Sequence, residues 1–530
     1  MNKPKTNRWL FALALASPLL IFFIGYIFNH SESLIPTGFS QYDNVSYVAY
    51  AKQYFDADTF HPGYSNPFNN GSSPAIYFQP HTLFFALLLY IGVPPGIILI
   101  PFVIICAIVC FRLVIAIYDT VANDDDKRVL NIWLFSWGGG LLVIGSSFAH
   151  AALKTGHPFL NDLFMLDPEG GWWGLNFGRS LLFSCEAYYH AIFLGCIYCL
   201  LKRKWTGAML LLLLISSSHP FTGIELICIV AGWCLLEFLF FKRSVPLFMV
   251  AGTLILLCFH IYYYLFYLNS FEVHRSVSQQ YALNWRLGWY RILPAYCIVG
   301  ILAIVSIAKK SFKAFFSNTW NRLFACWFII AFLLANHEVF MRPMQPIHFT
   351  RGYIWASLFL LGLPALRQLH LYIDRRWHRP GLCFFAFLFF FDNLLWISTH
   401  VAVRAKQPYA TYITAEQKNL FHLLDQESNN QTLIVSSDET IAYLSTVYTK
   451  ASPWYSHPYT TSFAEDKRRK QAAFFNEGKL DSSWKQCAVN FVLMRSDTLA
   501  FKSLLTLPAE KILKTGQYII FKFAPPKLEQ

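Results

Sequence analysis

An aspartate opens a tyrosine-rich stretch near the N-terminus, and its spacing to those tyrosines is helical. Asp43 is followed by Tyr47, Tyr50 and Tyr54 in the segment QYDNVSYVAYAKQYF. Residues spaced by three or four positions lie on one face of a helix. A carboxylate held there can take a proton from a reacting hydroxyl group. Aspartate is also a preferred N-cap residue, so a catalytic role and a capping role both remain open, and they are compatible.

A second acid-bearing segment, 148–179, lies between two apolar stretches. It contains His157, Asp162, Asp167 and the pair Trp172-Trp173. A carboxylate next to a histidine can hold or pass a proton, whereas the Asp-Pro step after Asp167 is also typical of a solvated turn. The tryptophans are either anchors at a membrane interface or a wall on which a sugar ring stacks.

Histidines and arginines mark the ends of other apolar stretches. His219 stands in SSSHPFTG, where a His-Pro break at membrane depth must line a cavity or be buried in protein. Arg342, His348 and Arg351 stand in RPMQPIHFTRGYIW, at the start of another apolar stretch. Arginine at such a helix start could bind a phosphate or simply contact lipid headgroups.

The composition predicts a polytopic membrane protein. Of the 530 residues, 55% are hydrophobic and only 14% are charged, and the mean hydropathy is +0.39. A soluble chain carries roughly 25% charged residues. The net charge of +13 does not indicate nucleic-acid binding, because the basic residues gather in short loops, as the positive-inside rule predicts. The twelve cysteines lie mostly in apolar stretches, which favours neither a metal site nor a disulfide framework.

Eleven apolar stretches are interpreted as transmembrane helices. They cover residues 9–28, 96–117, 130–147, 180–201, 206–218, 222–241, 246–268, 290–308, 323–339, 352–366 and 381–398. The first could be a signal peptide, but it is long enough to span and no clear cleavage site follows it. We predict a retained first helix with a cytosolic N-terminus.

The apolar stretch 75–92 decides the topology. If it crossed the membrane, the basic loops 202–204, 242–243 and 309–322 would all face outward. If it re-enters or lies at the interface, these loops face the cytosol, which the positive-inside rule favours. We therefore predict about eleven spans plus one juxtamembrane helix, with the C-terminal segment outside.

The composition changes near residue 400. TLIVSSDETIAYLSTVY predicts a strand followed by a helix, and VNFVLMRSD and GQYIIFKF predict further strands. We divide the chain into a helical transmembrane domain, 1–400, with external loops 29–95 and 148–179, and a small α/β domain, 401–530, on the outer side.

The first external loop resembles a known superfamily. Asp43, Tyr47 and Ala51 form the pattern D-x-x-x-Y-x-x-x-A, and the Pro-containing segment SPAIYFQPHTLFFALLLYIG precedes the next span. With the outer C-terminal domain, this resembles the GT-C superfamily of membrane glycosyltransferases, which includes protein O-mannosyltransferases and aminoarabinose transferases. Asn44 follows Asp43, so the Asp-Glu pair common in that superfamily is missing.

The resemblance implies an enzyme that transfers a sugar from a polyprenyl-phosphate donor to a lipid, glycan or protein acceptor, with inversion. Asp43 would be the catalytic base and Asp162 its helper. Arg351 would clamp the lipid phosphate. The implied substrate contacts are Tyr47, His81, His157, His219, Arg342, His348 and Arg351. Metal dependence differs within such families, so Mg²⁺ or Mn²⁺ remains open, and a bacterial inner membrane is the expected location.

Acids within apolar stretches keep two other hypotheses open. Glu186, Glu225 and Asp392 lie in or near predicted spans, and Glu186 is one helical turn from His190. Intramembrane acids are costly and commonly functional, so a transporter or lipid flippase with a proton relay is one alternative. A non-catalytic protein with the same fold is the other.

Overall fold

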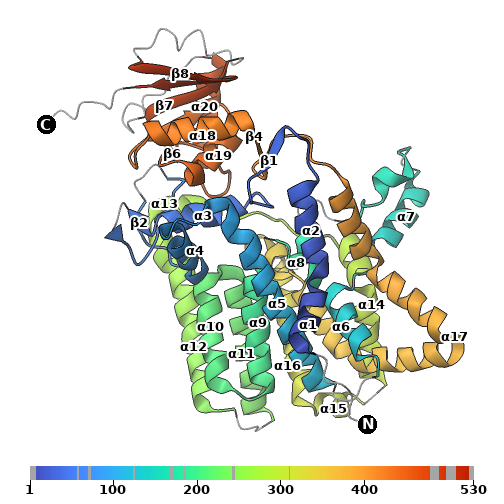
Figure 1. Ribbon diagram of the computed structural model, residues 1–530. Coiled ribbons are helices and arrows are strands. Elements are labelled where there is room, and N and C mark those ends of the chain that lie inside the picture. The colour runs from blue at the N-terminus through green and yellow to red at the C-terminus, as the bar shows by residue number, and fades with distance from the viewer. Residues whose placement is uncertain are drawn as a thin grey trace. The chain divides into compact units, whose positions relative to one another are not determined.

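A computed structural model describes residues 7–56, 59–69, 73–122, 126–154, 156–167, 172–183, 185–241, 245–309, 311–477, 489–496 and 509–523. The described chain is mostly helical (Figure 1). It forms two compact units whose segments alternate along the chain. Unit 1 comprises Met1–Gly25, Phe102–Tyr264 and Ala282–Val403, and unit 2 comprises Tyr26–Pro101, Leu265–Tyr281 and Arg404–Gln530.

Unit 1 is built from apolar helices. The helices that lie wholly or mainly in it are α1 (Arg8–Leu15), α2 (Ser17–Phe28), α5 (Pro95–Val121), α6 (Arg128–Trp137), α7 (Leu142–Leu153), α8 (Phe177–Ser180), α9 (Glu186–Leu201), α10 (Trp205–Ser218), α11 (Pro220–Leu239), α12 (Leu247–Ile261), α14 (Trp289–Ala308), α15 (Phe312–Phe316), α16 (Thr319–Ala335) and α17 (Tyr353–Ala402).

Fewer helices than expected are long and apolar enough to cross a membrane. Within the described residues there are five such segments: Pro95–Val121, Pro220–Leu239, Leu247–Ser270, Trp289–Ala308 and Pro346–Ala402. The count rises to seven if the bent pairs α1–α2 and α6–α7 each form one span. The expectation of eleven full-length spans is therefore corrected to between five and seven.

The shortfall has a local cause in the backbone. Helix α9 begins only at Glu186, because Cys185 has a positive φ of 52°, and it has 16 residues. Helices α10 and α16 have 14 and 17 residues. At 1.5 Å per residue, such helices are roughly 21–26 Å long, which is less than the roughly 30 Å of a hydrocarbon core. The two expected spans 352–366 and 381–398 lie in one helical run, α17, which is kinked at His378.

Unit 2 joins the first loop to the C-terminal segment. Its helices are α3 (Asn44–Lys52), α4 (Pro80–Tyr90), α13 (Glu272–Gln280), α18 (Ala415–Glu427), α19 (Glu439–Tyr448) and α20 (Ala464–Glu477). Strand β1 (Leu34–Pro36) pairs antiparallel with β4 (Tyr412–Thr414), so segments almost 380 positions apart share backbone hydrogen bonds. Helix α4 has 11 residues, which is too short to cross a bilayer unaided, and its expected place beside the membrane stays a prediction.

The C-terminal part of unit 2 is a five-stranded sheet with the order β6-β5-β7-β9-β8. Its strands are β5 (Leu433–Ser436), β6 (Ser452–Pro453), β7 (Val489–Arg495), β8 (Lys511–Thr515) and β9 (Tyr518–Lys522). Strand β5 is parallel to β6 and β7, whereas β9 is antiparallel to β7 and β8. The strands predicted from TLIV, VNFVLMR and QYIIFK are confirmed.

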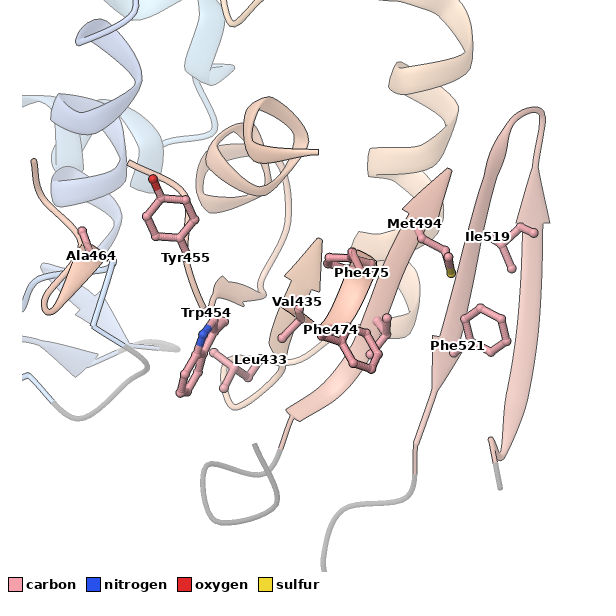
Figure 2. Close-up of a cluster of buried hydrophobic side chains, with 11 residues drawn as sticks. Leu433, Val435, Trp454, Tyr455, Ala464, Phe474, Phe475, Met494, Ile519 and Phe521 are labelled. Carbon is pink, nitrogen blue, oxygen red and sulfur yellow. The ribbon is translucent and has the colours of Figure 1, made fainter. Parts of the chain in front are cut away.

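An apolar core holds α20 against this sheet. Figure 2 shows Phe474 and Phe475 of α20 lying beside side chains of β5, β7 and β9, among them Val435, Met494 and Phe521. All five side chains are at most 5% exposed. Each large apolar side chain buried in this way contributes about 1.5–3 kcal/mol relative to exposure, so this cluster fixes the C-terminal sheet and its helix as one body.

Candidate functional site

Asp43 lies at the start of α3, but its side chain is not used to cap the helix. It occupies the N-cap position with φ −67° and ψ −16°, and its carboxylate makes no capping hydrogen bond. The side chain is 46% exposed. The helix ends at Lys52, so Tyr54 lies beyond the helical face predicted for it. The carboxylate is therefore accessible and is not committed to the helix.

Tyrosines gather around this carboxylate. The rings of Tyr42 and Tyr443 stack with centroids 4.5 Å apart, and Tyr409 stacks on Tyr42 at 5.5 Å. Burial raises the pKa of Tyr443 and of Tyr281 above the usual value, and the negative charge of Asp43 raises it further. These phenols stay protonated at neutral pH, so they can donate hydrogen bonds but do not act as bases.

His457 approaches Asp43 from the C-terminal segment of the same unit. Its Nε2 atom lies 3.5 Å from Oδ1 of Asp43, and its side chain is 4% exposed. The imidazole also lies 5.1 Å from the ring of Tyr42 and 5.2 Å from that of Tyr443, centroid to centroid. The aromatic and polar segment KASPWYSHPYTTSF made His457 a possible contact for the acceptor, together with Trp454 and Tyr455. No spacing rule in the sequence connects His457 to Asp43, so its place beside the carboxylate comes from the fold.

Two expected substrate contacts, Tyr47 and His81, meet in unit 2. Their ring centroids are 5.5 Å apart, with Tyr47 on α3 and His81 on α4. Burial lowers the pKa of His81 to about 3. The imidazole is therefore neutral at physiological pH, and any contact that it makes with a substrate is a hydrogen bond or a ring contact and not a charge pair.

Asp162 and His157 belong to unit 1 and lie next to each other there. Nδ1 of His150 lies 2.8 Å from Oδ2 of Asp162, and Nδ1 of His157 lies 3.4 Å from Oδ1. Asp162 is 8% exposed, whereas the side chain of His157 is 68% exposed. The carboxylate is thus held between two imidazoles, of which sequence reasoning singled out only one.

Three further expected contacts, His219, His348 and Arg351, come together in unit 1. The guanidinium of Arg351 forms an ion pair with Glu186, contacts His348 and lies 5.1 Å from the ring centroid of Trp173. Arg351 is 1% exposed. Since Glu186 already neutralises this guanidinium, its geometry favours a buried ion pair over contact with lipid headgroups.

The remaining arginine of that segment, Arg342, is exposed. Among the described residues, the contacts given for the Arg351 cluster do not include Arg342. Its expected role as a substrate contact stays a prediction.

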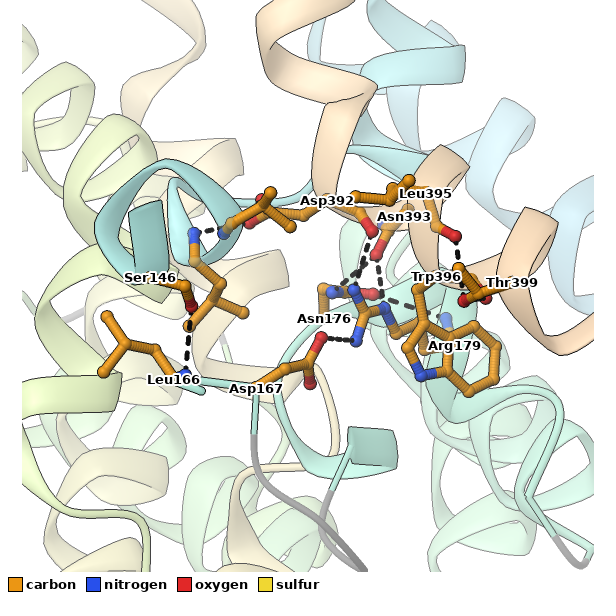
Figure 3. A network of polar contacts seen from close by, with 12 residues as sticks. Ser146, Leu166, Asp167, Asn176, Arg179, Asp392, Asn393, Leu395, Trp396 and Thr399 are labelled. Atoms are coloured by element: carbon orange, nitrogen blue, oxygen red, sulfur yellow. Dashed lines mark hydrogen bonds and ion pairs between the residues drawn. The ribbon is translucent and has the colours of Figure 1, made fainter. Parts of the chain in front are cut away.

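A second polar network in unit 1 provides hydrogen-bond partners for the buried side chains of Asp167 and Asp392. Figure 3 shows Arg179 at its centre: its guanidinium donates to Oδ2 of Asp167 at 2.5 Å and to Oδ1 of Asn393 at 2.6 Å. The carboxylate of Asp392 accepts from the backbone N–H groups of Leu142 and Val143, at 2.8 and 3.0 Å. Asp392 therefore satisfies donors at the start of α7, a structural role for an acid within an apolar run.

Unit 1 also contains an apolar cavity of about 950 Å³. Residues of α2, α6 and α17 line it, among them Ile21, Leu130, Trp133, Phe390 and Ile397. Cavities of 300–1,000 Å³ with apolar walls are typical of small-molecule or lipid sites. Its walls suit a hydrocarbon chain.

A metal centre is not evident in the described part of the chain. Within those residues, no group of three or more His, Cys, Asp or Glu side chains could hold a metal ion.

The chain matches no protein-family model, and it matches no curated protein.

Proposed function

We propose that this chain is a membrane glycosyltransferase of the GT-C type, which moves a sugar from a polyprenyl-phosphate donor to a hydroxyl group of an acceptor. The observation that carries the proposal is the Asp43 carboxylate. It is 46% exposed, it makes no capping bond to its own helix, and it lies among tyrosine rings. An accessible carboxylate beside aromatic rings suits sugar chemistry, because rings pack against sugar C–H faces while the carboxylate accepts a proton.

In the proposed reaction, Asp43 takes the proton of the acceptor hydroxyl as its oxygen attacks the anomeric carbon. The new bond forms from that oxygen, and the bond between the anomeric carbon and the phosphate oxygen breaks. The polyprenyl phosphate leaves with the electron pair, so the anomeric configuration inverts. Asp43 ends protonated and returns its proton to water.

We also assign roles in this proposed reaction to the other residues that were expected to act as a second acid, as substrate contacts or as the phosphate clamp. Asp162, which lies in unit 1, stays a predicted second catalytic acid, and Tyr47 and His81, which lie in unit 2 with Asp43, would contact the sugar or the acceptor. A cation must offset the charge on the leaving phosphate. Arg351 was the expected clamp, but it is paired with Glu186, so Arg342 and a bound Mg²⁺ or Mn²⁺ ion are the remaining candidates.

The apolar helices support a membrane-embedded lipid donor. The cavity lined by α2, α6 and α17 is one place where a polyprenyl chain could lie. We propose a multi-pass protein of a bacterial inner membrane, with a cytosolic N-terminus and the C-terminal segment on the extracytoplasmic side. The acceptor would be a lipid, a glycan or a protein.

One observation favours a second candidate function, a proton-coupled transporter or lipid flippase. Glu225 lies in α11 with 0% exposure, and neither carboxyl oxygen has a hydrogen-bond partner among the described residues. Buried acids in spans are often parts of proton pathways. The accessible Asp43 among tyrosines has no evident use in such a protein, so we place the transferase first.

The test is sugar transfer from a radiolabelled polyprenyl-phosphate sugar pool, catalysed by membranes with matched amounts of wild type, Asp43→Asn or Asp438→Asn. Asp438 is the matched control, because it caps α19 through the N–H groups of Thr440 and Ile441, and asparagine caps helices equally well. We expect Asp43→Asn to lose about 10²-fold or more in rate, while Asp438→Asn retains transfer.

Two other outcomes have clear meanings. Unchanged transfer by Asp43→Asn would refute the catalytic role and leave Asp43 as a helix-boundary residue. If wild type transfers nothing from any donor in the pool, the proposal fails for that donor class. Transport of lipid or solute by wild type and its loss in Glu225→Gln would then support the second candidate.

A further inference from the structure

The loop between β6 and α20 brings an imidazole to the candidate base, and the hydrogen bonds of that imidazole fix which nitrogen holds the proton. Nδ1 of His457 accepts from the backbone N–H of Tyr459 at 3.2 Å and from that of Thr460 at 3.3 Å. A nitrogen that accepts two N–H groups cannot carry a hydrogen itself. The proton of the neutral ring is therefore on Nε2, the atom that lies 3.5 Å from Asp43.

Backbone hydrogen bonds and two aromatic neighbours also hold His457 in place. Its backbone N–H donates to Oγ1 of Thr461 at 3.2 Å, and its carbonyl accepts from the N–H of Thr461 at 3.0 Å. The rings of Tyr42 and Phe68 lie 5.1 and 6.2 Å from it, centroid to centroid. A buried ring fixed by its own turn and by aromatic neighbours presents Nε2–H in one direction.

We propose that His457 is a positioning residue that donates its Nε2–H to Oδ1 of Asp43 and so leaves Oδ2 free to take the acceptor proton. This inference rests on the proposed function of Asp43 as a base. His457 itself does not take the proton, because Nδ1 is occupied by backbone donors and Nε2 already carries hydrogen. At 3.5 Å the contact is long, and such hydrogen bonds commonly shorten when substrate binds.

The proposal assigns a role to the C-terminal segment. Asp43 comes from the first loop and His457 from a segment more than 400 positions later, and both belong to unit 2. The site needs the C-terminal segment for the orientation of its carboxylate. A shift of the carboxylate by about 1 Å would cost about 10²-fold in rate, which sets the scale of the expected effect.

Two substitutions separate positioning from a merely structural role. Asparagine places an amide oxygen near the position of Nδ1, so His457→Asn keeps the acceptor for Tyr459 and Thr460 but removes the donor to Asp43. Glutamine places an amide N–H near the position of Nε2, so His457→Gln keeps the donor but loses the local turn. Each variant therefore keeps one hydrogen-bonding function of the imidazole and loses the other.

The experiment measures kcat and KM for sugar transfer and the thermal stability of both variants in detergent. Positioning predicts that His457→Asn is the more stable variant and yet the slower one, with kcat about 10- to 10²-fold below wild type and KM little changed. His457→Gln should be the faster variant despite lower stability. If activity simply follows stability, so that His457→Asn is as fast as His457→Gln or faster, the proposal is wrong.

A second readout does not depend on transfer. A carbodiimide that labels accessible carboxylates is applied to each protein, and the labelling rate of Asp43 is read by mass spectrometry. We expect faster labelling of Asp43 in His457→Asn than in wild type and in His457→Gln. Equal rates in all three refute the contact. If wild type shows no transfer but the rates differ in this way, the proposed function fails while the interaction between His457 and Asp43 stands.

Discussion

The phenol oxygen of Tyr443 lies 2.7 Å from Oγ of Ser46, although 397 positions separate the two residues in the chain. The same oxygen accepts from the backbone N–H of Ser46 at 3.1 Å and donates to the carbonyl of Tyr42 at 3.0 Å. One buried hydroxyl thus bridges α19 to both sides of Asp43. The direction in which α3 presents the carboxylate depends on this link.

Removal of that hydroxyl should therefore destabilise unit 2. Tyr443→Phe removes the hydrogen bonds of this hydroxyl to the backbone N–H of Ser46 and the carbonyl of Tyr42, and each such bond is worth about 0.5–1.5 kcal/mol, so we expect a loss of about 1–3 kcal/mol in the free energy of unfolding. Tyr409→Phe is the matched control, because Tyr409 is 50% exposed. Its effect should stay within about 0.5 kcal/mol. Chemical unfolding in detergent measures both, and equal values for the two variants would contradict the bridge.

The Glu186–Arg351 ion pair should respond asymmetrically to substitution. Arg351→Met leaves the carboxylate of Glu186 buried without its cation, so we expect a loss of about 3–5 kcal/mol. The double variant Glu186→Gln with Arg351→Met removes both charges and should recover part of that loss. A thermal unfolding series on the single and double variants makes the comparison. A double variant that is less stable than either single variant would rule out the buried-pair interpretation.

A close backbone contact in unit 2 requires glycine on both sides. Gly38 has φ +87°, and a Cβ on Gly96 would lie 2.0 Å from the carbonyl oxygen of Thr37. We expect Gly96→Ala to reduce the yield of folded protein strongly, because backbone atoms would have to move. Gly300→Ala, in α14, meets no atom within 4 Å and should be neutral or slightly stabilising. Size-exclusion profiles in detergent distinguish the two, and a normal profile for Gly96→Ala would contradict this geometry.

Stability should fall as the pH falls, in part because of His274. Burial lowers the pKa of this imidazole from 6.5 to about 4. Nδ1 of His274 lies 2.9 Å from the hydroxyl oxygen of Tyr77. Between pH 4 and 6.5 the unfolded chain binds a proton here that the folded chain does not, so the contribution is complete above pH 6.5 and is lost as the pH falls towards 4.

The measurement is the free energy of unfolding from pH 4 to 7 for wild type and His274→Gln. The variant should show a shallower slope in this window. The exposed His422, replaced by glutamine, is the control and should leave the slope unchanged. Parallel curves for wild type and His274→Gln would show that the imidazole does not titrate differently on folding.

Local patterns in the sequence were sufficient for a mostly helical chain with several helices long and apolar enough to cross a membrane, for the C-terminal strands and for helix α3. Hydropathy and alternation act over a few residues, so β5, β7, β9 and α19 follow from them directly. The number of full-length spans did not follow in this way. Helix ends depend on single backbone positions, such as the positive φ of Cys185, and a hydropathy window averages over them.

The sequence predicted one part of the candidate site, and only the tertiary structure identified the other part. Asp43 could be singled out from its type and spacing, because a lone acid before a run of tyrosines is a local signal. Its partners could not: His457, Tyr443 and Tyr281 reach it from segments hundreds of positions away. The tertiary structure also decided that Arg351 pairs with Glu186. Burial and pairing of charges depend on which distant side chains share one volume, and the order of residues along the chain does not state that.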